Sequence, residues 1–451
     1  MSQTEEGSTQ RTDEIKTRAA RYRVLPLSEL RPDPGNARHH TRAQVRAIAK
    51  SIEAFGFNAP ILVDKNNKII AGHGRYEAAR LRGDPEVPVI FLDHLNEAQV
   101  KAYMLADNKL TDRSTWDEAK LAASLKELSE LVLDFDITAT GFEVPEIDLR
   151  IQSLEDPNAV DEADEFQLAP TMPTSIPGDL WLLGEHRLLC GNAIERDSYA
   201  QLMEQDLAAA VFTDPPYNVK VDGHVCGLGT IKHREFAMAS SEMTEAEYLR
   251  FLTGAFDGMC GNSSAGALIY ACMDWRHIDV LLAAGRSRQA ELLNLCVWVK
   301  TNAGMGSFYR SQHELVAVFR NKDAAHRNNI QLGRFGRNRT NVWNYAGANA
   351  FPRKGGKSDL ALHPTVKPIR LVSDAILDST QPNDIILDPF IGSGTTILAA
   401  ERTRRRCFGM EIDPLYVDLA IERWQRQTGR PARTPQGETY ADINASRGGP
   451  R

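Results

Sequence analysis

The tetrapeptide Asp214-Pro215-Pro216-Tyr217 combines an acid, two prolines and an aromatic ring directly after an apolar run. Prolines restrict the backbone and carry no N–H, so their carbonyl oxygens are free to accept hydrogen bonds from a ligand. The Asp214 carboxylate and the Pro215 carbonyl can both accept from one exocyclic NH₂ group, while Tyr217 can stack on a base. Alone, such a tetrapeptide is usually a rigid proline turn, so its interpretation depends on its surroundings.

A second loop, Asp388-Pro389-Phe390-Ile391-Gly392-Ser393-Gly394-Thr395-Thr396, follows another apolar run. It is no dinucleotide fingerprint, because Ile397 stands where the third glycine belongs, and no Gly-Lys-Ser/Thr completes a Walker loop. Its glycines allow close approach of the backbone to a ligand. Glu411, nineteen residues after Gly392, suits hydrogen bonding to ribose hydroxyls. This pattern predicts a nucleoside cofactor.

Both loops require a sheet that places them at one edge. Between about residues 177 and 427, short apolar runs alternate with helical segments, which predicts a parallel α/β sheet. The expected strands are 207–212, 265–270, 293–299, 315–319 and 385–387. Ligands of open α/β sheets bind beyond the carboxyl ends of strands, so the two loops can reach one crevice.

Residues 177–427 resemble the beta group of DNA amino-methyltransferases, which modify adenine N6 or cytosine N4. The resemblance implies a Rossmann-like doubly wound fold, S-adenosylmethionine as cofactor and catalysis by Asp214, Pro215, Pro216 and Tyr217. The residues that it implies for cofactor binding are Asp388, Phe390, Gly392, Gly394, Thr395, Glu411, Thr365, Lys367 and Asn192. Thr365 and Lys367 belong to the segment His363 to Pro368, which resembles the family's H-P-T-x-K-P motif. Asn192 departs from the pattern, since relatives often carry Asp there.

The implied mechanism flips the target base out of double-stranded DNA and needs no metal. Hydrogen bonds from its amino group to Asp214 and Pro215 then favour the nucleophilic, pyramidal form, and positioning carries much of the rate. The Asp-Pro-Pro-Tyr form favours adenine, since many cytosine-N4 enzymes begin this motif with Ser. Cytosine-N4 and RNA methylation stay open as alternatives.

A basic stretch lies between the two loops, where the beta group carries its target-recognition region. From Arg320 to Lys357 there are nine Lys and Arg residues against the single acid Asp323, although the whole chain has a net charge of −7. Aromatic residues are interleaved with these cations, which suits phosphate contacts and base stacking as well as a simple solvated face. The expected DNA contacts, within a region of about 320–357, are Arg334, Arg337, Arg339, Arg353 and Lys354.

Residues 23–113 contain the segments Asn36-Ala37-Arg38, Pro60-Ile61-Leu62-Val63 and Ile70-Ala71-Gly72-His73-Gly74-Arg75. On these segments they resemble the N-terminal domain of ParB-type partition proteins. The segment Gly72-His73-Gly74-Arg75, before a predicted helix, resembles the part of that family that binds the phosphates of CTP. Backbone N–H groups at a helix start, with one Arg, suit such binding. His73-Gly74 stands where partition proteins often have Glu-Arg, so a docking domain without nucleotide is the alternative.

The sequence therefore predicts six segments: a disordered leader (1–20), a ParB-like α+β domain (21–113), a helical extension (114–150), an acidic linker (151–176), a methyltransferase domain (177–427) and a disordered tail (428–451). The cysteines form no C-x-x-C pair, which indicates reduced thiols. The sequence shows no long apolar run and no signal-like start, so we expect a cytoplasmic protein that is prokaryotic or phage-encoded. A homodimer is compatible with these features, and no metal site is expected.

The function predicted is adenine-N6 methylation of DNA. A second hypothesis is a ParB-type nucleotide-gated DNA-binding protein whose methyltransferase half is vestigial. The intact motifs around Asp214, Gly392, Glu411 and Lys367 favour the first hypothesis.

Overall fold

Residues 21–111, 113–154, 164, 172–218, 243–300, 309–334, 339–345 and 367–447 are described by the structure, a computed structural model. The chain divides into two units, unit 1 (Met1–Leu154) and unit 2 (Glu155–Arg451). Each unit has hydrophobic clusters of its own. No helix of the described ranges is long and apolar enough to cross a bilayer. The expected leader, 1–20, lies outside the described residues.

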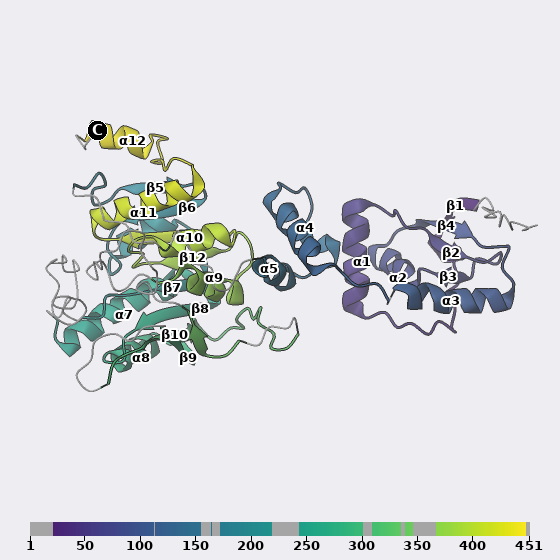
Figure 1. The fold of residues 1–451 in the computed structure, drawn as a ribbon, viewed down its shortest axis with the longest axis horizontal. Coiled ribbons are helices and arrows are strands. Elements are labelled where there is room, and N and C mark those ends of the chain that lie inside the picture. Colours follow the sequence, from purple (N-terminus) through teal and green to yellow (C-terminus); the bar gives the residue numbers. More distant parts are fainter. Residues whose placement is uncertain are drawn as a thin grey trace, which may run out of the picture. The chain divides into compact units, whose positions relative to one another are not determined.

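Unit 1 contains a four-stranded sheet with helices packed on it (Figure 1). Its strands, in the order β1-β4-β2-β3, are β1 (Arg21–Pro26), β4 (Glu86–Phe91), β2 (Ile61–Val63) and β3 (Ile69–Ala71). Its helices are η1 (Leu27–Glu29), α1 (Arg42–Phe55), α2 (His73–Arg82), α3 (Glu97–Thr111), α4 (Glu118–Glu130), η2 (Ile137–Thr140) and α5 (Val144–Gln152). The helix expected after Gly72-His73-Gly74-Arg75 is α2, and α4 lies within the expected helical extension, 114–150.

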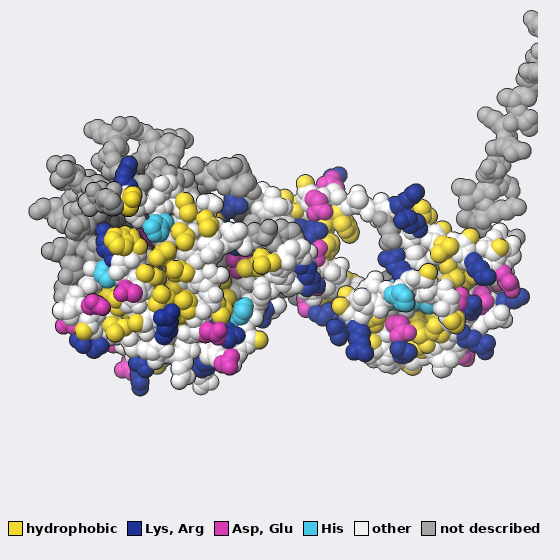
Figure 2. Space-filling view, turned by 90° about the horizontal axis from the view of Figure 1, so that it is seen from below, with side chains coloured by type: hydrophobic (Ala, Val, Ile, Leu, Met, Phe, Trp, Pro, Cys, Tyr) yellow, Lys and Arg dark blue, Asp and Glu magenta, His cyan; other side chains and the backbone are white. Residues whose placement is uncertain are grey.

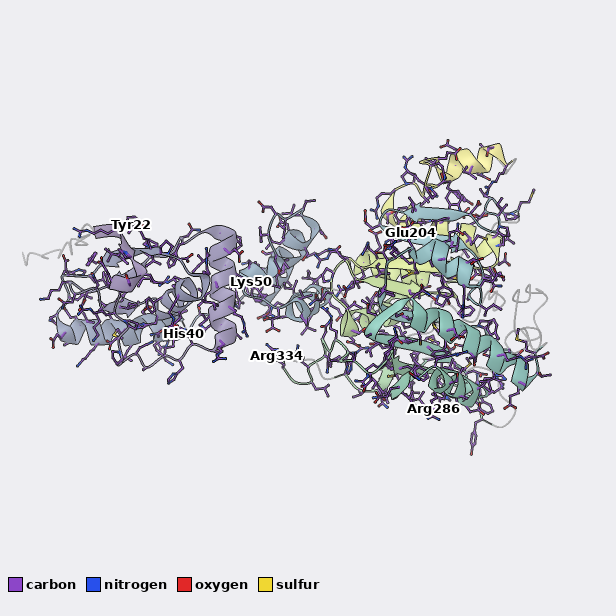
Figure 3. The ribbon with its side chains drawn as sticks, turned by 180° about the vertical axis from the view of Figure 1, so that it is seen from behind. Tyr22, His40, Lys50, Glu204, Arg286 and Arg334 are labelled. Atoms are coloured by element: carbon purple, nitrogen blue, oxygen red, sulfur yellow. The ribbon has the colours of Figure 1, made fainter. Side chains whose placement is uncertain are left out.

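Capping residues set the ends of the unit 1 helices. Thr41 accepts a hydrogen bond from the Gln44 backbone N–H and begins α1, and Gly56 ends it at a φ of 82° that side chains disfavour. Lys50 of α1, labelled in Figure 3, pairs with Asp136 at 3.2 Å, which ties α1 to the helical extension. Figure 2 shows Lys and Arg side chains around the edge of this unit.

Unit 2 is built on a nine-stranded sheet in the order β11-β9-β10-β8-β7-β12-β13-β6-β5. The strands are β5 (Leu180–Leu183), β6 (His186–Cys190), β7 (Ala208–Thr213), β8 (Ser263–Met273), β9 (Glu291–Val299), β10 (His313–Arg320), β11 (Val342–Asn344), β12 (Ile385–Asp388) and β13 (Arg406–Glu411). The helices are α6 (Arg196–Met203), α7 (Glu245–Gly261), α8 (Ile278–Ser287), α9 (Ile369–Ser379), α10 (Thr395–Arg402), α11 (Pro414–Thr428) and α12 (Tyr440–Ser446).

Helices cover both faces of this sheet, as the doubly wound prediction requires (Figure 1). Successive strand residues point to opposite faces. In β7, Phe212 therefore joins the cluster that contains α9, α10 and α11, and Val211 joins the cluster that contains α6, α7 and α8. The α/β class with a Rossmann-like sheet is confirmed.

The parallel sheet that the sequence predicts carries antiparallel strands at its two margins. Strands β8, β7, β12, β13 and β6 run parallel, but β10 is antiparallel to both β8 and β9, and β5 is antiparallel to β6. The sequence predicts these strands from apolar runs, and such runs carry no information about strand direction.

The tail prediction, 428–451, is wrong for the part that the structure describes, up to Arg447. Arg433 exchanges two backbone hydrogen bonds with Leu182 of β5, at 2.7 and 2.9 Å, and Tyr440 of α12 packs edge-on against Trp181. Polar composition suggested disorder, but this segment pairs with an edge strand and buries an aromatic ring.

Candidate active site

The four predicted catalytic residues follow β7 at the carboxyl edge of the parallel strands. Pro215 is buried, and the Pro216 carbonyl accepts a 2.8 Å hydrogen bond from the hydroxyl of Tyr248 in α7. No described residue donates a hydrogen bond to the Pro215 carbonyl, which leaves it available to a ligand. Tyr248, which the sequence did not point to, therefore fixes the position of this loop, while the Pro215 carbonyl stays free to accept a hydrogen bond.

The Asp214 carboxylate lies between a phenol and an ammonium group. Tyr217 donates its hydroxyl to Asp214 Oδ1 at 2.6 Å, and Lys367 Nζ lies 2.6 Å from Asp214 Oδ2. The sequence assigned Lys367 to the cofactor, but the structure places its ammonium on Asp214, the predicted catalytic acid. The Lys367 side chain is only 4% exposed, which makes this pair an interior one.

A second carboxylate, Glu314 of β10, completes the cluster and was not predicted. Its Oε2 atom lies 2.9 Å from Lys367 Nζ and accepts from the Tyr217 hydroxyl at 3.3 Å, while its Oε1 pairs with Lys300. Only its placement at the start of a strand of buried apolar residues, Leu315 to Phe319, could have singled it out in the sequence. Two carboxylates and two ammonium groups thus balance in a buried cluster.

Burial and neighbouring charge shift the two acids in opposite directions. Burial raises the pKa of Asp214, and the repulsion from Glu314 adds to this while Lys367 opposes it. Burial also works against the charged form of Glu314, but Lys367 and Lys300 outweigh it and hold its pKa at about 2. The charged form is therefore disfavoured at Asp214 and favoured at Glu314.

The glycine loop after β12 is arranged by hydrogen bonds and close packing. Asp388 accepts from the Phe390 backbone N–H at 3.1 Å and from the Thr396 hydroxyl at 2.6 Å, and burial raises its pKa to about 7. Gly394 has a φ of 84°, and a Cβ there would lie 2.7 Å from Ala420 Cβ. Glycine is therefore required at Gly394 for both conformation and helix contact.

A buried arginine, Arg423 of α11, supports the same loop and was not predicted. Its Nη1 atom donates to the Ser393 carbonyl at 2.7 Å and to the Ser393 hydroxyl at 2.8 Å. These bonds hold the turn between the two glycines against α11.

Glu411 ends β13, next to the glycine loop. Its carboxylate accepts the Gly392 backbone N–H at 3.0 Å and the Asp413 backbone N–H at 2.9 Å. Burial nevertheless raises its pKa to about 7. A Cβ on Gly392 would meet no atom within 4 Å, so the backbone there faces open space. A carboxylate beside an uncrowded backbone turn fits a nucleoside with ribose hydroxyls.

Asn192 extends this edge beyond β6, the parallel neighbour of β13. The Gly191 backbone N–H donates to the Glu411 carbonyl at 2.9 Å, which places Asn192 next to Glu411. The Asn192 side chain donates to Glu195 and accepts from the Ile194 backbone N–H, so it stabilises its own turn. The carboxyl ends of β6, β13, β12 and β7 thus bring the described cofactor candidates and the catalytic loop to one edge.

The predicted DNA contacts have three different outcomes. Arg337, Arg353 and Lys354, together with the cofactor candidate Thr365, lie outside the described residues. Arg334 is exposed in the loop after β10, where Figure 3 labels it. Arg339 instead donates to Asp374 at 3.1 Å and pairs with Asp378 at 2.7 Å.

Arg339 is therefore corrected to an internal residue, because its guanidinium is matched to buried carboxylates of α9. The aromatic residues of the basic stretch need the same correction where they are described. Trp343 is buried in the core with only 6% exposure, and Tyr345 donates its hydroxyl to Asp374. Composition did not separate these core residues from surface ones.

In unit 1, the segment Gly72 to Arg75 forms the start of α2. Gly72 has a φ of 103°, and no side chain caps the helix N-terminus. His73 Nε2 accepts the Asp33 backbone N–H at 3.2 Å, so its ring contacts protein, and burial lowers the pKa of His73. Arg75 lies over Gly72, whose Cβ would be 3.0 Å from its guanidinium.

Comparison with known proteins places this arrangement among DNA-modifying enzymes. A family model described as DNA methylase, of the N6/N4 amino-methyltransferase type, matches residues 208–422. Models of the ParB N-terminal domain and the ParB-methyltransferase HTH domain match residues 10–127 and 119–177. The second of these includes α4 and α5.

Individual relatives match the two halves separately. The type II methyltransferase M.HpaI of Haemophilus parainfluenzae is 25% identical over 253 residues, which cover 53% of this chain and 74% of the relative. The ParB-like nuclease domain-containing protein YnaK of Escherichia coli is 46% identical over 74 residues, 16% of this chain and 85% of the relative. The crystal structure of M1.HpyAVI has 20% identity and a TM-score of 0.37, covering 52% of this chain and 96% of its own.

The sheet, the acid-proline loop and the glycine loop define a methyltransferase class of protein. The chain carries a DNA methylase domain of the N6/N4 amino-methyltransferase type, a ParB N-terminal domain and a ParB-methyltransferase HTH domain.

Proposed function

We propose that the protein transfers a methyl group from S-adenosylmethionine to adenine N6 in double-stranded DNA. The observation that carries this proposal is the catalytic loop, in which the Asp214 carboxylate and an unused Pro215 carbonyl lie beside each other at the edge that also holds Glu411. Two acceptors side by side match the two hydrogens of one exocyclic amine.

The described residues fit the cofactor through their donor and acceptor chemistry. We assign Glu411 to the ribose hydroxyls of the cofactor. The turn of Gly392 and Gly394 lets the backbone approach the cofactor closely, and we assign Asn192 to the far end of its nucleoside. S-adenosylmethionine supplies an electrophilic methyl group on a sulfonium centre. Phe390 and Thr395 belong to the same loop and are assigned to it with Asp388, which holds its backbone.

The chain's own residues then prepare the amine. The target base leaves the stack, because enzymes that act on a base cannot reach their target atom while the base is stacked in a duplex. Asp214 and Pro215 accept the two amine hydrogens and direct the lone pair toward the methyl group. Lys367 remains paired with Glu314, so its charge stays balanced when Asp214 turns to the amine. Tyr217 stacks on the base and donates its hydroxyl within the cluster.

Adenine is favoured over cytosine by the acid at position 214. Expression of the protein in a methylation-free host, followed by mass spectrometry of the hydrolysed DNA, distinguishes N6-methyladenine from N4-methylcytosine. Sequencing that detects modified bases gives the recognition site. A genome with no modified base would contradict the proposal and favour a DNA-binding protein with a vestigial catalytic half.

The catalytic assignment has its own test. Asp214→Asn keeps the shape of the side chain and removes its charge, and we expect it to lower turnover by at least about 10²-fold, as loss of a charge-assisted contact in a transition state does. Binding of S-adenosylmethionine by calorimetry should be retained, because the glycine loop and Glu411 are untouched. Turnover comparable to that of the wild type would refute the role of Asp214.

A second proposal concerns the ParB-like domain. We propose that the N-terminus of α2 binds the phosphates of CTP, since its backbone N–H groups lack a side-chain cap and Arg75 lies over Gly72. Arg75→Ala should abolish CTP binding measured by calorimetry. Arg80→Ala, on the exposed side of the same helix, is the matched control. Equal CTP affinity in both variants would refute the site.

A further inference from the structure

The loop after β8 reaches the same edge of the sheet as the catalytic loop. Strands β7 and β8 are parallel neighbours with Thr213 opposite Ala271, so Asp274 to His277 emerges beside Asp214. In the strand order, β8 lies on one side of β7 and the cofactor strands β12 and β13 lie on the other. The catalytic loop is therefore flanked by the cofactor residues on one side and by residues 274–277 on the other.

A chain of contacts fixes this loop to the catalytic loop. Asp274 Oδ1 accepts the backbone N–H of His277 at 3.2 Å and lies 3.2 Å from its Nδ1 atom. The His277 ring packs edge-on against Tyr248 at 5.4 Å, and Tyr248 donates to the Pro216 carbonyl. The loop thus has a defined position relative to the catalytic prolines.

Two side chains of this loop, Trp275 and Arg276, are exposed. Trp275 is 56% exposed and takes no part in either hydrophobic cluster of unit 2. The Arg276 guanidinium lies 5.2 Å from the Trp275 ring centroid and pairs with Asp274 at 3.0 Å. The Trp275 indole therefore offers a flat face for stacking on an unstacked base, and the neighbouring Arg276 guanidinium offers a positive charge for its phosphate.

We propose that Trp275 and Arg276 form a DNA contact beside the active site. Trp275 stacks on the base of the nucleotide next to the flipped one, and Arg276 binds the adjoining phosphate. Asp274 acts as a positioning residue, since it shapes the turn and orients the Arg276 guanidinium. This contact rests on the proposed function, because it requires DNA to reach the catalytic edge. It lies outside the basic stretch 320–357, so it gives the substrate a second point of attachment.

The test uses the full chain with a duplex that contains the recognition site, and with S-adenosylhomocysteine present. Stacking of one base on an aromatic residue contributes enough that Trp275→Ala should weaken DNA binding by about 5- to 150-fold. Trp275→Phe, which keeps a flat ring, should recover most of that affinity. Arg276→Ala should reduce the slope of log Kd against log salt by about 1, the value for one phosphate contact.

Arg286→Ala is the matched control, since Arg286 is an exposed cation in the last turn of α8, labelled in Figure 3. It should leave both affinity and salt slope unchanged. Cofactor affinity and melting temperature should match the wild type in all variants, because neither side chain contributes to the core.

The proposed contact would be overturned if Trp275→Ala and Arg276→Ala had the same DNA affinity and salt slope as Arg286→Ala. This holds even if the wild type methylates DNA normally. A wild-type protein that methylates no DNA would overturn the proposed function instead. In that case the same binding comparison, made with a mixed-sequence duplex, would still decide whether this loop contacts DNA, so the two failures are distinguishable.

Discussion

Replacing Glu314 with Gln tests whether the buried cluster is held by charge balance. Glu314 contacts Lys367 at 2.9 Å, accepts from Tyr217 and pairs with Lys300. Glutamine has nearly the same shape, but it turns one acceptor oxygen into an NH₂ group that faces ammonium groups. The variant leaves two lysines and only one carboxylate, Asp214, in an interior where the residue at 314 is 8% exposed.

The magnitude follows from the loss of one partner in a buried ion pair. Two charges about 4 Å apart interact by about 4 kcal/mol at an effective dielectric constant of about 20. Measured losses for breaking one side of a buried pair are about 3–5 kcal/mol. For a domain of a few hundred residues, each kcal/mol moves the melting temperature by about 2–4 °C, so we expect a fall on the order of 10 °C.

The same substitution should slow methyl transfer. Without Glu314, Lys367 has Asp214 as its remaining carboxylate and holds it more tightly, so Asp214 is less available to the amine. Misplacement of a reacting group by about 1 Å can cost about 10²-fold in rate, and we expect kcat to fall by that order while the affinity for S-adenosylmethionine is retained.

The assay is a thermal melt at pH 7.5 together with single-turnover methylation. The matched control is Glu291→Gln on the neighbouring strand β9, whose partner is Arg320 and whose side chain is 57% exposed. Such a surface pair contributes only about 0–1 kcal/mol. The reasoning would be refuted if Glu314→Gln melted within about 2 °C of Glu291→Gln and methylated DNA at the wild-type rate. A difference of about 2 °C corresponds to roughly 1 kcal/mol or less.

Three further predictions concern the cofactor edge and the corrected arginine. Gly394→Ala should destabilise the protein by about 1–3 kcal/mol and weaken cofactor binding, since the added Cβ would lie 2.7 Å from Ala420 Cβ. Gly392→Ala, whose Cβ would meet no atom within 4 Å, should destabilise the protein less. Thermal melts and calorimetry compare the stability and the cofactor affinity of the two variants. Burial raises the pKa of Glu411 to about 7, so below that pH its carboxyl is protonated and poorly suited to accept hydrogen bonds from ribose hydroxyls. The affinity for the cofactor should therefore fall as the pH drops from 8 to 6. A titration in which the Glu411→Gln variant keeps that pH dependence would contradict this prediction. Arg339→Met should lower the melting temperature because it leaves two buried aspartates unbalanced, yet leave the salt slope of DNA binding unchanged; a reduced slope would restore its assignment as a DNA contact.

Much of the fold and of the site was predictable because its signals are local. The five expected strands of unit 2 all exist, with bounds within a few residues, since each is an apolar run between polar or glycine-containing turns. The catalytic loop and the glycine loop are short segments whose proline and glycine residues restrict or permit particular backbone angles. Such restrictions are covalent, so they can be read without knowing what lies nearby.

Tertiary structure alone decided which charges meet. Lys367 and Asp214 are 153 residues apart, and Glu314 belongs to a third element, β10. Their contact depends on the order and direction of strands, which apolar periodicity does not encode. The same limit explains Arg339, whose charge is matched by carboxylates of α9 rather than by DNA. The sequence determined the chemistry that each loop carries, and the fold determined which distant side chain neutralises it, because a buried charge is stable only where topology brings it a partner.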